Sequence, residues 1–216
     1  MHASEYTADP FAALADNLRP LALRGDLRRY RKGHRLIQEG DVGDTLFIIL
    51  SGRVRAFGSG DRDREITHGT YGAGEYMGEI SLDGGPRSAS VETLEPCWCS
   101  VVTRQSVLQH IVEYPEFAFD LLSKVIRRAR NATLNAKQLA LNDVYGRLVL
   151  LLNALAVPRD DGVRVVAERL THQEMANRLG CSREMVSRQL KDLESGGYIA
   201  SPGRFYEILK SLPARW

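Results

Sequence analysis

A carboxylate and a guanidinium flank a glycine turn in the segment GEISLDGGPRSAS, residues 78–90. Glu79 and Arg87 are eight positions apart, and a Gly-Gly-Pro sequence lies between them. A guanidinium offers forked N–H donors that pair with a carboxylate or a phosphate, and the amides of a glycine-rich turn bind anions. The segment therefore has two interpretations: a surface ion pair between Glu79 and Arg87 that closes a hairpin, or a binding site for an anionic ligand.

A second group of chemically active residues lies near the C-terminus, in the segment THQEMANRLGCSREMVSRQLKDLE. Arg183 and Arg188 carry forked donors that match guanine O6 and N7, and the carboxylate of Glu184 can accept from cytosine N4. The segment is therefore suited to reading base edges in DNA, the alternative being a solvated charged face on a small helical domain. The candidate DNA-binding residues are Thr171, His172, Gln173, Ser182, Arg183, Glu184, Ser187, Arg188 and Lys191.

Two helices joined by a short turn must position this polar face. Thr171 and Glu174 have the spacing of a capping box, which predicts where the first helix begins. Gly180 suits the C′ position of that helix, and Ser182 is a good cap for the second. Thr171, Gln173 and Ser182 then stand at helix N-termini, which suit phosphate contacts. The residues expected on the buried face of the second helix are Val186, Leu190 and Leu193.

The segment YIASPGRFYEIL follows these two helices. It predicts a hairpin that turns at Pro202-Gly203. Two helices, a short turn and a hairpin are typical of a winged helix-turn-helix.

The first hundred residues predict the elements that hold Glu79 and Arg87. DTLFIILSGRVRAF predicts two strands joined at Ser51-Gly52, and REITHGTYGAGEYMG predicts another strand followed by glycine-rich turns. SASVETLEPCWCSVVT predicts two more strands around Glu95-Pro96. Short strands with turn signals at this spacing are typical of a β-sandwich or barrel such as a jelly roll.

Helical periodicity replaces the strand pattern from about residue 103 to residue 155. Pro115 marks a break, and a long helix is predicted to run from there to Asn142. Asn142 and Asp143 are poor helix formers and interrupt the pattern. The second helical run, VYGRLVLLLNALA, is predicted to end at Pro158.

The long helix has more than one apolar side. One side alternates steps of four and three residues, which predicts a seam between two helices of a dimer, the alternative being a helix that lies only on its own sheet. The seam residues are Ala118, Leu122, Val125, Ala129, Ala132, Ala136 and Leu139. The residues expected to cover the sheet are Leu121, Ile126, Leu134 and Leu141.

Composition bounds the class of protein. The chain has 216 residues, of which 44% are hydrophobic and 26% charged, and a formal net charge of +2, as expected for a globular protein with two modest domains. No apolar run approaches the ~20 residues that span a bilayer, and the start has no signal-peptide pattern. Cys97, Cys99 and Cys181 lack metal-ligand spacing. We therefore expect a cytoplasmic protein with reduced thiols, no metal and no membrane association.

An enzyme is not predicted. The sequence has no nucleophile beside a base and no Walker loop, and its five histidines are scattered.

Together the two halves resemble the cyclic-AMP receptor protein and FNR family of bacterial transcription regulators, over about residues 15 to 210. The motifs that carry the resemblance are GEYMGEISL…PRSASV, LALNDVYGRL and THQEMANRLGCSREMVSRQLKDLE. The resemblance implies an α+β fold in three parts. These are a cyclic-nucleotide-binding β-roll (a double-stranded jelly roll) at 1–115, a long dimerisation helix at 116–142, and a winged helix-turn-helix at 143–216.

The resemblance also implies that residues 78–90 bind the phosphate of a cyclic nucleotide. Arg87 is then expected to pair with the phosphate, amides near Ile80 and the hydroxyl of Ser88 to donate to it, and Glu79 to accept from the ribose 2′-hydroxyl. Gly74 and Gly78 allow close backbone approach. The candidate ligand-binding residues are Gly78, Glu79, Ile80, Ser81, Arg87, Ser88, Arg128 and Thr133.

The chain departs from the family pattern where a Thr-Ser pair faces the adenine in the cyclic-AMP receptor. Ala132-Thr133 stand there, and Ala132 cannot hydrogen-bond the exocyclic amine, a loss of about 1 kcal/mol. Cyclic AMP is the first candidate, and cyclic GMP, cyclic di-GMP or no ligand are alternatives. The cysteine cluster of the FNR branch is missing before Cys97, and His68 leaves a haem-sensing branch open.

The hypothesis from the sequence is a homodimeric, ligand-responsive transcription regulator. The resemblance implies a palindromic operator with TGTGA-like half-sites, because Arg183, Glu184 and Arg188 match the family's base-reading residues. It also implies contact with RNA polymerase, through the turn VPRDDG. The alternative from another class is a cyclic-nucleotide module that regulates a protein partner, for which the polar face after Ser182 has no use.

Overall fold

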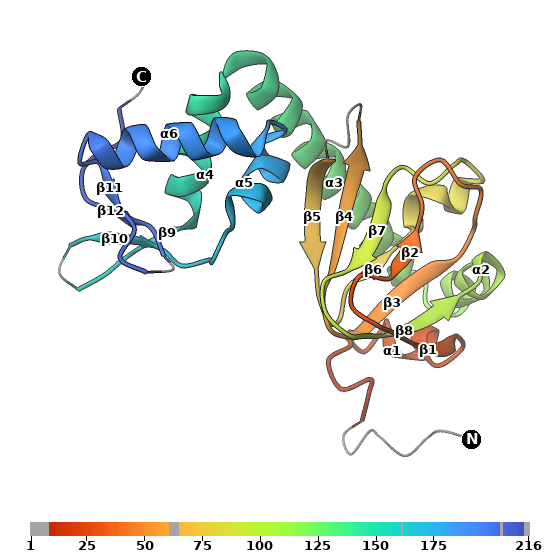
Figure 1. Cartoon of the computed structure of the whole chain (residues 1–216). Helices are drawn as coiled ribbons and strands as arrows, with labels where there is room; N and C mark the ends of the chain where they lie inside the picture. The colour runs from red at the N-terminus through yellow and green to blue at the C-terminus, as the bar shows by residue number, and fades with distance from the viewer. Residues whose placement is uncertain (1–8, 61–64, 161, 204, 214–216) are drawn as a thin grey trace. The chain divides into compact units, whose positions relative to one another are not determined.

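The computed structural model describes residues 9–60, 65–160, 162–203 and 205–213. The chain divides into two compact units, one formed by residues 1–59 and 67–129 and the other by residues 60–66 and 130–216. Each unit combines helices with an antiparallel sheet or sheets (Figure 1), and the predicted α+β class is confirmed.

Short strands dominate the N-terminal unit, as the sequence predicts. Its strands are β1 (Asp26–Tyr30), β2 (Arg35–Ile37), β3 (Leu46–Ser51), β4 (Val54–Ser59), β5 (Glu65–Tyr71), β6 (Tyr76–Met77), β7 (Ser90–Thr93) and β8 (Cys97–Val102). They form two four-stranded sheets, in the orders β1-β8-β3-β6 and β2-β7-β4-β5. The helical elements are α1 (Arg19–Ala22), the 3-10 helix η2 (Glu79–Asp83), α2 (Arg104–Glu113) and α3 (Glu116–Leu141), which continues into the second unit.

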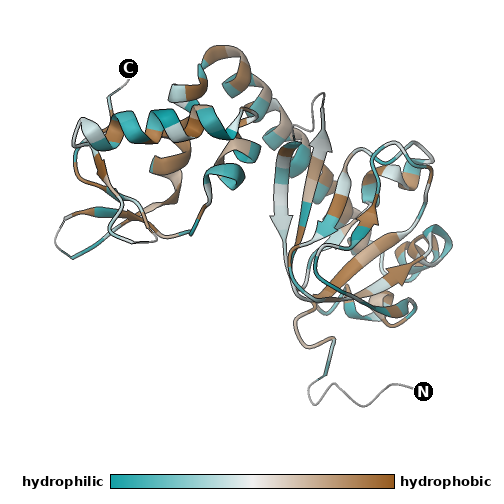
Figure 2. Cartoon of the chain, in the orientation of Figure 1, coloured by the Kyte–Doolittle hydropathy of each residue, from teal (hydrophilic) through white to brown (hydrophobic). Residues whose placement is uncertain are grey.

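Strand β3 explains how the two layers of core arise, because its residues 46–50 are all buried. Side chains alternate across a strand, and here Ile48 packs in a cluster with α1 and α2, whereas Ile49 packs in the other cluster, with Val91 and Cys97. The strand is correspondingly brown in Figure 2. Cys97 and Cys99, two residues apart on β8, both lie in that second cluster.

The long helix contacts its own sheet over a narrower face than the sequence predicts. Phe117 is buried and Leu121 packs beside it. The expectation that Ile126, Leu134 and Leu141 cover the sheet is wrong, because their exposed fractions are 41%, 55% and 71%. The break in the helix is predicted correctly: α3 ends at Leu141, and the side chain of Asp143 caps the next helix.

The described part of the C-terminal unit contains the end of α3, three further helices and a four-stranded sheet in the order β11-β12-β10-β9. Its elements are α4 (Val144–Leu155), β9 (Ala156–Pro158), β10 (Arg164–Val166), α5 (His172–Leu179), α6 (Arg183–Ser195), β11 (Ile199–Ala200) and β12 (Glu207–Ile208). The expectation that the helix now named α4 runs to Pro158 is wrong. It ends at Leu155, because residues 156–158 pair with β10 as strand β9.

Local sequence signals account for both helices of the C-terminal motif. Thr171 and Glu174 form the predicted capping box, and Gly180 ends α5 in the left-handed conformation with φ of 65°. Ser182 caps α6 by accepting from the amide of Met185. The predicted hairpin is also present, since β11 pairs with β12.

Candidate ligand-binding turn and DNA-binding face

The turn at residues 78–88 begins with a glycine that no other residue could replace without strain. Gly78 has φ of 97°, and a Cβ there would lie 2.6 Å from the carbonyl oxygen of Thr45 and 2.7 Å from Nη1 of Arg87. The 3-10 helix η2 follows, and Gly84 ends it with φ of 94°. The glycines therefore let the chain fold tightly around the side chain of Arg87.

Arg87 lies inside this turn and is only 7% exposed. Its Nη1 donates to the carbonyl of Gly78 at 3.0 Å and to the hydroxyl of Ser81 at 2.7 Å. Its Nη2 donates to the carbonyl and the hydroxyl oxygen of Thr45, both at 3.0 Å. Burial lowers the pKa of the guanidinium, and the carboxylates of Asp44 and Glu79 oppose that shift. The charge is thus held in place before any ligand contributes.

Glu79 is buried, with its side chain fully inaccessible to solvent. Its Oε1 pairs with Nη1 of Arg128 on α3, whereas Oε2 has no hydrogen-bond partner among the described residues. The alternative of a surface ion pair between Glu79 and Arg87 is therefore wrong, since both residues are buried and the carboxylate pairs with Arg128. A buried carboxylate oxygen without a donor costs free energy, so this atom is suited to accept from a ligand.

Two cations of α3 dock on β6 beside this turn. Nζ of Lys124 donates to the carbonyl of Tyr76 at 2.8 Å and lies 3.5 Å from the centroid of the Tyr76 ring. The guanidinium of Arg128 lies 5.0 Å from the centroid of the Tyr71 ring. Burial, reinforced by the positive charge of Arg128, lowers the pKa of Lys124 to about 8. Burial also raises the pKa of Tyr76 to about 12.

The remaining predicted ligand residues differ in how far they are buried. Ser81 is buried and bonded to Arg87, Ile80 is 43% exposed, and Ser88 is exposed at the end of the turn. Thr133 is an exposed residue of α3, and its role stays a prediction, as do those of the other residues.

Sequence reasoning missed three residues that complete this site. Thr45 and Tyr76 supply backbone carbonyl acceptors, and Lys124 supplies a partly buried amine. Motif spacing could not reveal them, because Thr45 is 42 residues from Arg87 and Lys124 is 48 residues from Tyr76. The helical spacing of Lys124 and Arg128 was the one available signal, since residues four apart share a face.

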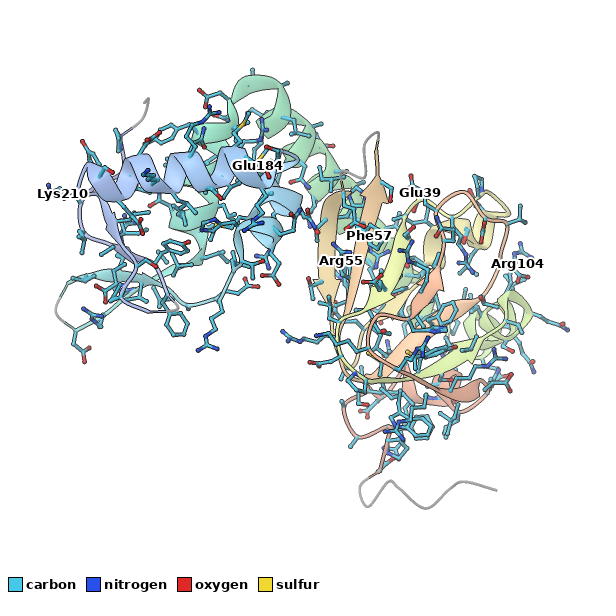
Figure 3. All side chains as sticks on the ribbon, in the orientation of Figure 1. Glu39, Arg55, Phe57, Arg104, Glu184 and Lys210 are labelled. Atoms are coloured by element: carbon cyan, nitrogen blue, oxygen red, sulfur yellow. The ribbon has the colours of Figure 1, made fainter. Side chains whose placement is uncertain are left out.

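The polar face of α6 has the character expected for DNA recognition. Arg183, Glu184, Arg188 and Lys191 are all exposed, and Glu184 stands near the start of the helix (Figure 3). Bonds from its own amide and from the hydroxyl of Ser182 lower the pKa of Glu184. The predicted opposite face is confirmed: Val186, Leu190 and Leu193 are buried. Teal residues accordingly alternate with brown ones along α6 in Figure 2.

At the start of α5 the predicted contact residues make bonds to their neighbours. The side-chain amide of Gln173 donates to Oδ1 of Asn177 at 2.8 Å. Nδ1 of His172 lies 2.7 Å from the hydroxyl of Ser187 on α6, and Nε2 lies 2.9 Å from the hydroxyl of Tyr206. His172 and Tyr206 also line an open hollow of about 430 Å³ beside the wing. Sequence reasoning did not single out Tyr206.

The described part of the chain has no group of three or more His, Cys, Asp or Glu residues arranged to hold a metal ion. Within the same residues, every helix is too short or too polar to cross a membrane.

Comparison with known proteins identifies both units. Residues 27–114 match the model of the cyclic nucleotide-binding domain, and residues 146–211 match that of the Crp-like helix-turn-helix domain. The fold and the two sites thus define a class, that of transcription regulators with a cyclic nucleotide-binding domain and a helix-turn-helix.

Relatives of known function and structure match this chain over both units. The chain is 32% identical to the CRP-like cAMP-activated global transcriptional regulator of Mycobacterium tuberculosis, over 89% of this chain and 85% of that protein. It is 31% identical to the cAMP-activated global transcriptional regulator CRP of Haemophilus influenzae, over 82% and 81%. The structure of the c-di-GMP responsive global regulator CLP of Xanthomonas campestris matches with a TM-score of 0.78 and 26% identity, over 90% and 98%. The chain belongs to the CRP family of transcription regulators, as the resemblance implied.

Proposed function

We propose that this chain is a dimeric regulator that binds a palindromic operator and that a cyclic nucleotide in the N-terminal unit controls its affinity for DNA. The observation that carries the proposal is the buried carboxylate of Glu79. One of its oxygens lacks a hydrogen-bond donor among the described residues, in the same turn that holds the buried charge of Arg87. A ligand with a hydroxyl and a phosphate would satisfy both groups.

The turn would bind the ligand through three kinds of group. Arg87 supplies a fixed positive charge for the phosphate. The 3-10 helix begins at the left-handed Gly78, where backbone amides suit an anion. Glu79 would accept from a ribose hydroxyl on Oε2 while Oε1 stays with Arg128. Because the two Nη atoms of Arg87 are already bonded to protein, we expect the phosphate to replace part of that set.

The ligand signal would pass to α3 through Arg128. This side chain holds Glu79, the carbonyl of Tyr76 and the sulfur of Met77. A ligand hydroxyl bonded to Glu79 would change the strength of the ion pair between Glu79 and Arg128. It would thereby change the free energy with which α3 is held against the turn and β6. Such a ligand shifts the population of two arrangements only by its differential affinity for them.

The dimer would form along the apolar seam of α3. Leu122, Val125 and Leu139 on this seam are 53%, 37% and 45% exposed, so the single chain leaves the predicted seam uncovered. The alanines between them would let two helices approach closely.

The recognition helices would read two half-sites one helical turn apart, ~34 Å. Arg183, Glu184 and Arg188 are the residues proposed to contact base edges, in TGTGA-like half-sites. Thr171, Gln173 and Ser182 are proposed to contact phosphates. We also propose that the regulator acts in the cytoplasm and meets RNA polymerase through the turn at residues 157–162, where Asp161 lies outside the described residues.

Cyclic di-GMP is a second candidate ligand. The relative from Xanthomonas campestris is named as responsive to it and shares 26% identity with this chain. Ala132 stands in place of a hydroxyl residue that faces adenine in the cyclic-AMP receptor. The missing hydrogen bond would weaken the binding of cyclic AMP by about 1 kcal/mol.

A salt-controlled DNA titration tests the proposal. Full-length protein is titrated onto a fluorescent TGTGA-type palindrome without ligand, and then with cyclic AMP, cyclic GMP and cyclic di-GMP in turn. We expect one nucleotide to tighten binding by roughly tenfold or more, about 1.4 kcal/mol of coupling. If the protein binds tightly without ligand and none of the three changes the affinity, nucleotide control is refuted. If it binds the palindrome no better than random DNA, operator recognition is refuted.

A further inference from the structure

A short chain of hydrogen bonds joins the wing of the C-terminal unit to the polar face of α6. It comprises the hydroxyl of Tyr206, the imidazole of His172 at the start of α5, and the hydroxyl of Ser187 in the middle of α6, with distances of 2.9 Å and 2.7 Å. All three residues are half-buried. We propose that Tyr206 is a positioning residue for DNA recognition: through His172 it orients the hydroxyl of Ser187 toward the DNA. This rests on the proposed operator binding.

The chemistry of the imidazole determines which group donates in each of the two hydrogen bonds of His172. A neutral histidine has one ring N–H donor and one ring acceptor, so one of the two hydroxyls must donate to the ring and the other must accept from it. The phenol of Tyr206 is the more acidic hydroxyl and therefore the better donor. Tyr206 then donates to Nε2, and the N–H at Nδ1 donates to Ser187.

This arrangement leaves the proton of Ser187 free to donate elsewhere. Ser187 lies one residue before Arg188 and four after Arg183, on the helix face proposed to read bases. A hydroxyl that accepts from Nδ1 keeps its one proton to donate to a base edge or a phosphate, whereas a serine that donated to the ring would have no proton left for the DNA. Tyr206 thus restricts which partner α6 accepts at this position.

The backbone around the phenol is fixed well enough to carry this role. The carbonyl of Tyr206 accepts from the amide of Val166 at 2.9 Å, and the next residue, Glu207, begins β12. His172 is equally fixed, because it follows Thr171 in the capping box. Burial raises the pKa of Tyr206, so the phenol keeps the proton that it must donate.

The first experiment needs no DNA. In protein labelled with ¹⁵N-histidine, ring nitrogen shifts report which imidazole nitrogen carries the proton, and His172→Gln assigns the signal. We expect His172 to carry its proton at Nδ1 in the wild type, and Tyr206→Phe to shift it toward Nε2. An unchanged tautomer in Tyr206→Phe would overturn the proposal, because Tyr206 would then not set the direction of the chain.

The second experiment measures affinity for the palindrome and for a panel of half-sites with single base-pair substitutions. We expect Tyr206→Phe and Ser187→Ala each to weaken binding by about 3- to 10-fold and to relax the preference at the same base pair. In the double variant, Tyr206→Phe should add less than about twofold. Tyr198→Phe is the matched control, a tyrosine packed against the same core, and we expect it to leave the preference unchanged.

The outcomes separate this proposal from operator binding itself. Additive losses, or losses at different base pairs, overturn the positioning role while operator binding stands. A wild type that binds no palindrome refutes operator binding, and the tautomer experiment still decides whether Tyr206 directs His172. Ser187→Thr keeps a hydroxyl and should retain the coupling to Tyr206, which separates loss of the bond from a change in helix packing.

Discussion

The ligand turn at residues 78–88 and the polar face of α6 both present arginines suited to an anionic partner, yet they hold them in opposite ways. Arg87 is 7% exposed and uses both Nη atoms in bonds to the protein. Arg183 and Arg188 are exposed at the surface. The first charge is already bonded before a ligand arrives, whereas the second two are displayed to solvent.

This difference suits the two tasks proposed for the regions. An exposed arginine acts at long range and attracts a polyanion before contact. A buried and bonded arginine can accept a ligand only if some of its bonds exchange, so binding there is linked to rearrangement of the surrounding chain. We therefore expect the turn to act as a switch and α6 to read the DNA sequence, and substitutions should affect the two regions differently.

The largest effect is expected for Arg87→Leu. The change removes four bonds and takes a donor from the carbonyls of Gly78 and Thr45, of which Gly78 keeps the hydroxyl of Ser81 as a donor. We expect the unfolding free energy of the N-terminal unit to fall by about 2–4 kcal/mol, and nucleotide affinity to fall by roughly 100-fold or more, because a charged pair is lost. Denaturant titration and isothermal calorimetry measure these two quantities.

Arg104→Leu is the matched control for this change. Arg104 lies at the start of α2 (Figure 3) and donates to the carbonyl of Leu82 in the same turn at 2.8 Å, but it is exposed. We expect less than about 1 kcal/mol of destabilisation and little change in nucleotide affinity. Equal effects of the two substitutions would show that burial does not distinguish Arg87.

Arg188→Ala should have the next largest effect, and it should leave stability unchanged. The side chain is exposed, so its removal exposes no buried group. If it reads a guanine, DNA affinity should fall by about 1–3 kcal/mol and the preference at one base pair should relax. Competition titrations with substituted operators measure both. An unchanged sequence preference would count against direct reading by Arg188.

The same contrast explains what the sequence could predict. The C-terminal motif is built from local rules, so the capping box at Thr171, the left-handed Gly180 and the cap at Ser182 were all predicted correctly. The residues of the polar face followed from helical periodicity alone. The short strand β9 was missed, because its pairing with the next strand, β10, stops α4 at Leu155, and the helical pattern of residues 144–156 does not reveal that pairing.

The ligand turn was predicted in part. The segment around Glu79 and Arg87 stood out by its residue types, but the partners did not. Glu79 pairs with Arg128, which is 49 residues away, and Arg87 bonds to Thr45. Tertiary packing alone brings such groups together, and the choice between a surface ion pair and a buried site depended on it.

Lys124 provides a pH test that separates the two regions. Its pKa is about 8 in the folded chain and about 10.4 in an unfolded chain. Between these values the unfolded state binds more protons, so the unfolding free energy should rise with pH. The side chain is only partly buried, so we expect about 1 kcal/mol in total. Chemical denaturation of wild type and Lys124→Met at several pH values measures the difference.

The pH dependence of Lys124→Met must be subtracted from that of the wild type, because other groups in the same unit also titrate. Burial raises the pKa of Tyr76 and, further away in the same unit, that of Cys99, each to about 12, and these groups lower stability at alkaline pH. The charges of Arg128 and Glu79 also act on Lys124. If wild type and Lys124→Met have the same pH dependence, the low pKa is refuted. The same measurement on the C-terminal unit should show no difference.

The smallest effect is expected for Thr171→Ala, which tests the local character of the C-terminal unit. The change removes the bond that Thr171 accepts from the amide of Glu174 and breaks the capping box, a loss of about 1 kcal/mol. Ser182→Ala should cost less, because Met185 at N3 of α6 cannot return a bond as Glu174 does. Hydrogen exchange resolved by residue should place both losses in the C-terminal unit. A loss of protection in the turn at residues 78–88 would contradict the view that the C-terminal helices are stabilised locally, since a helix cap acts only on the residues beside it.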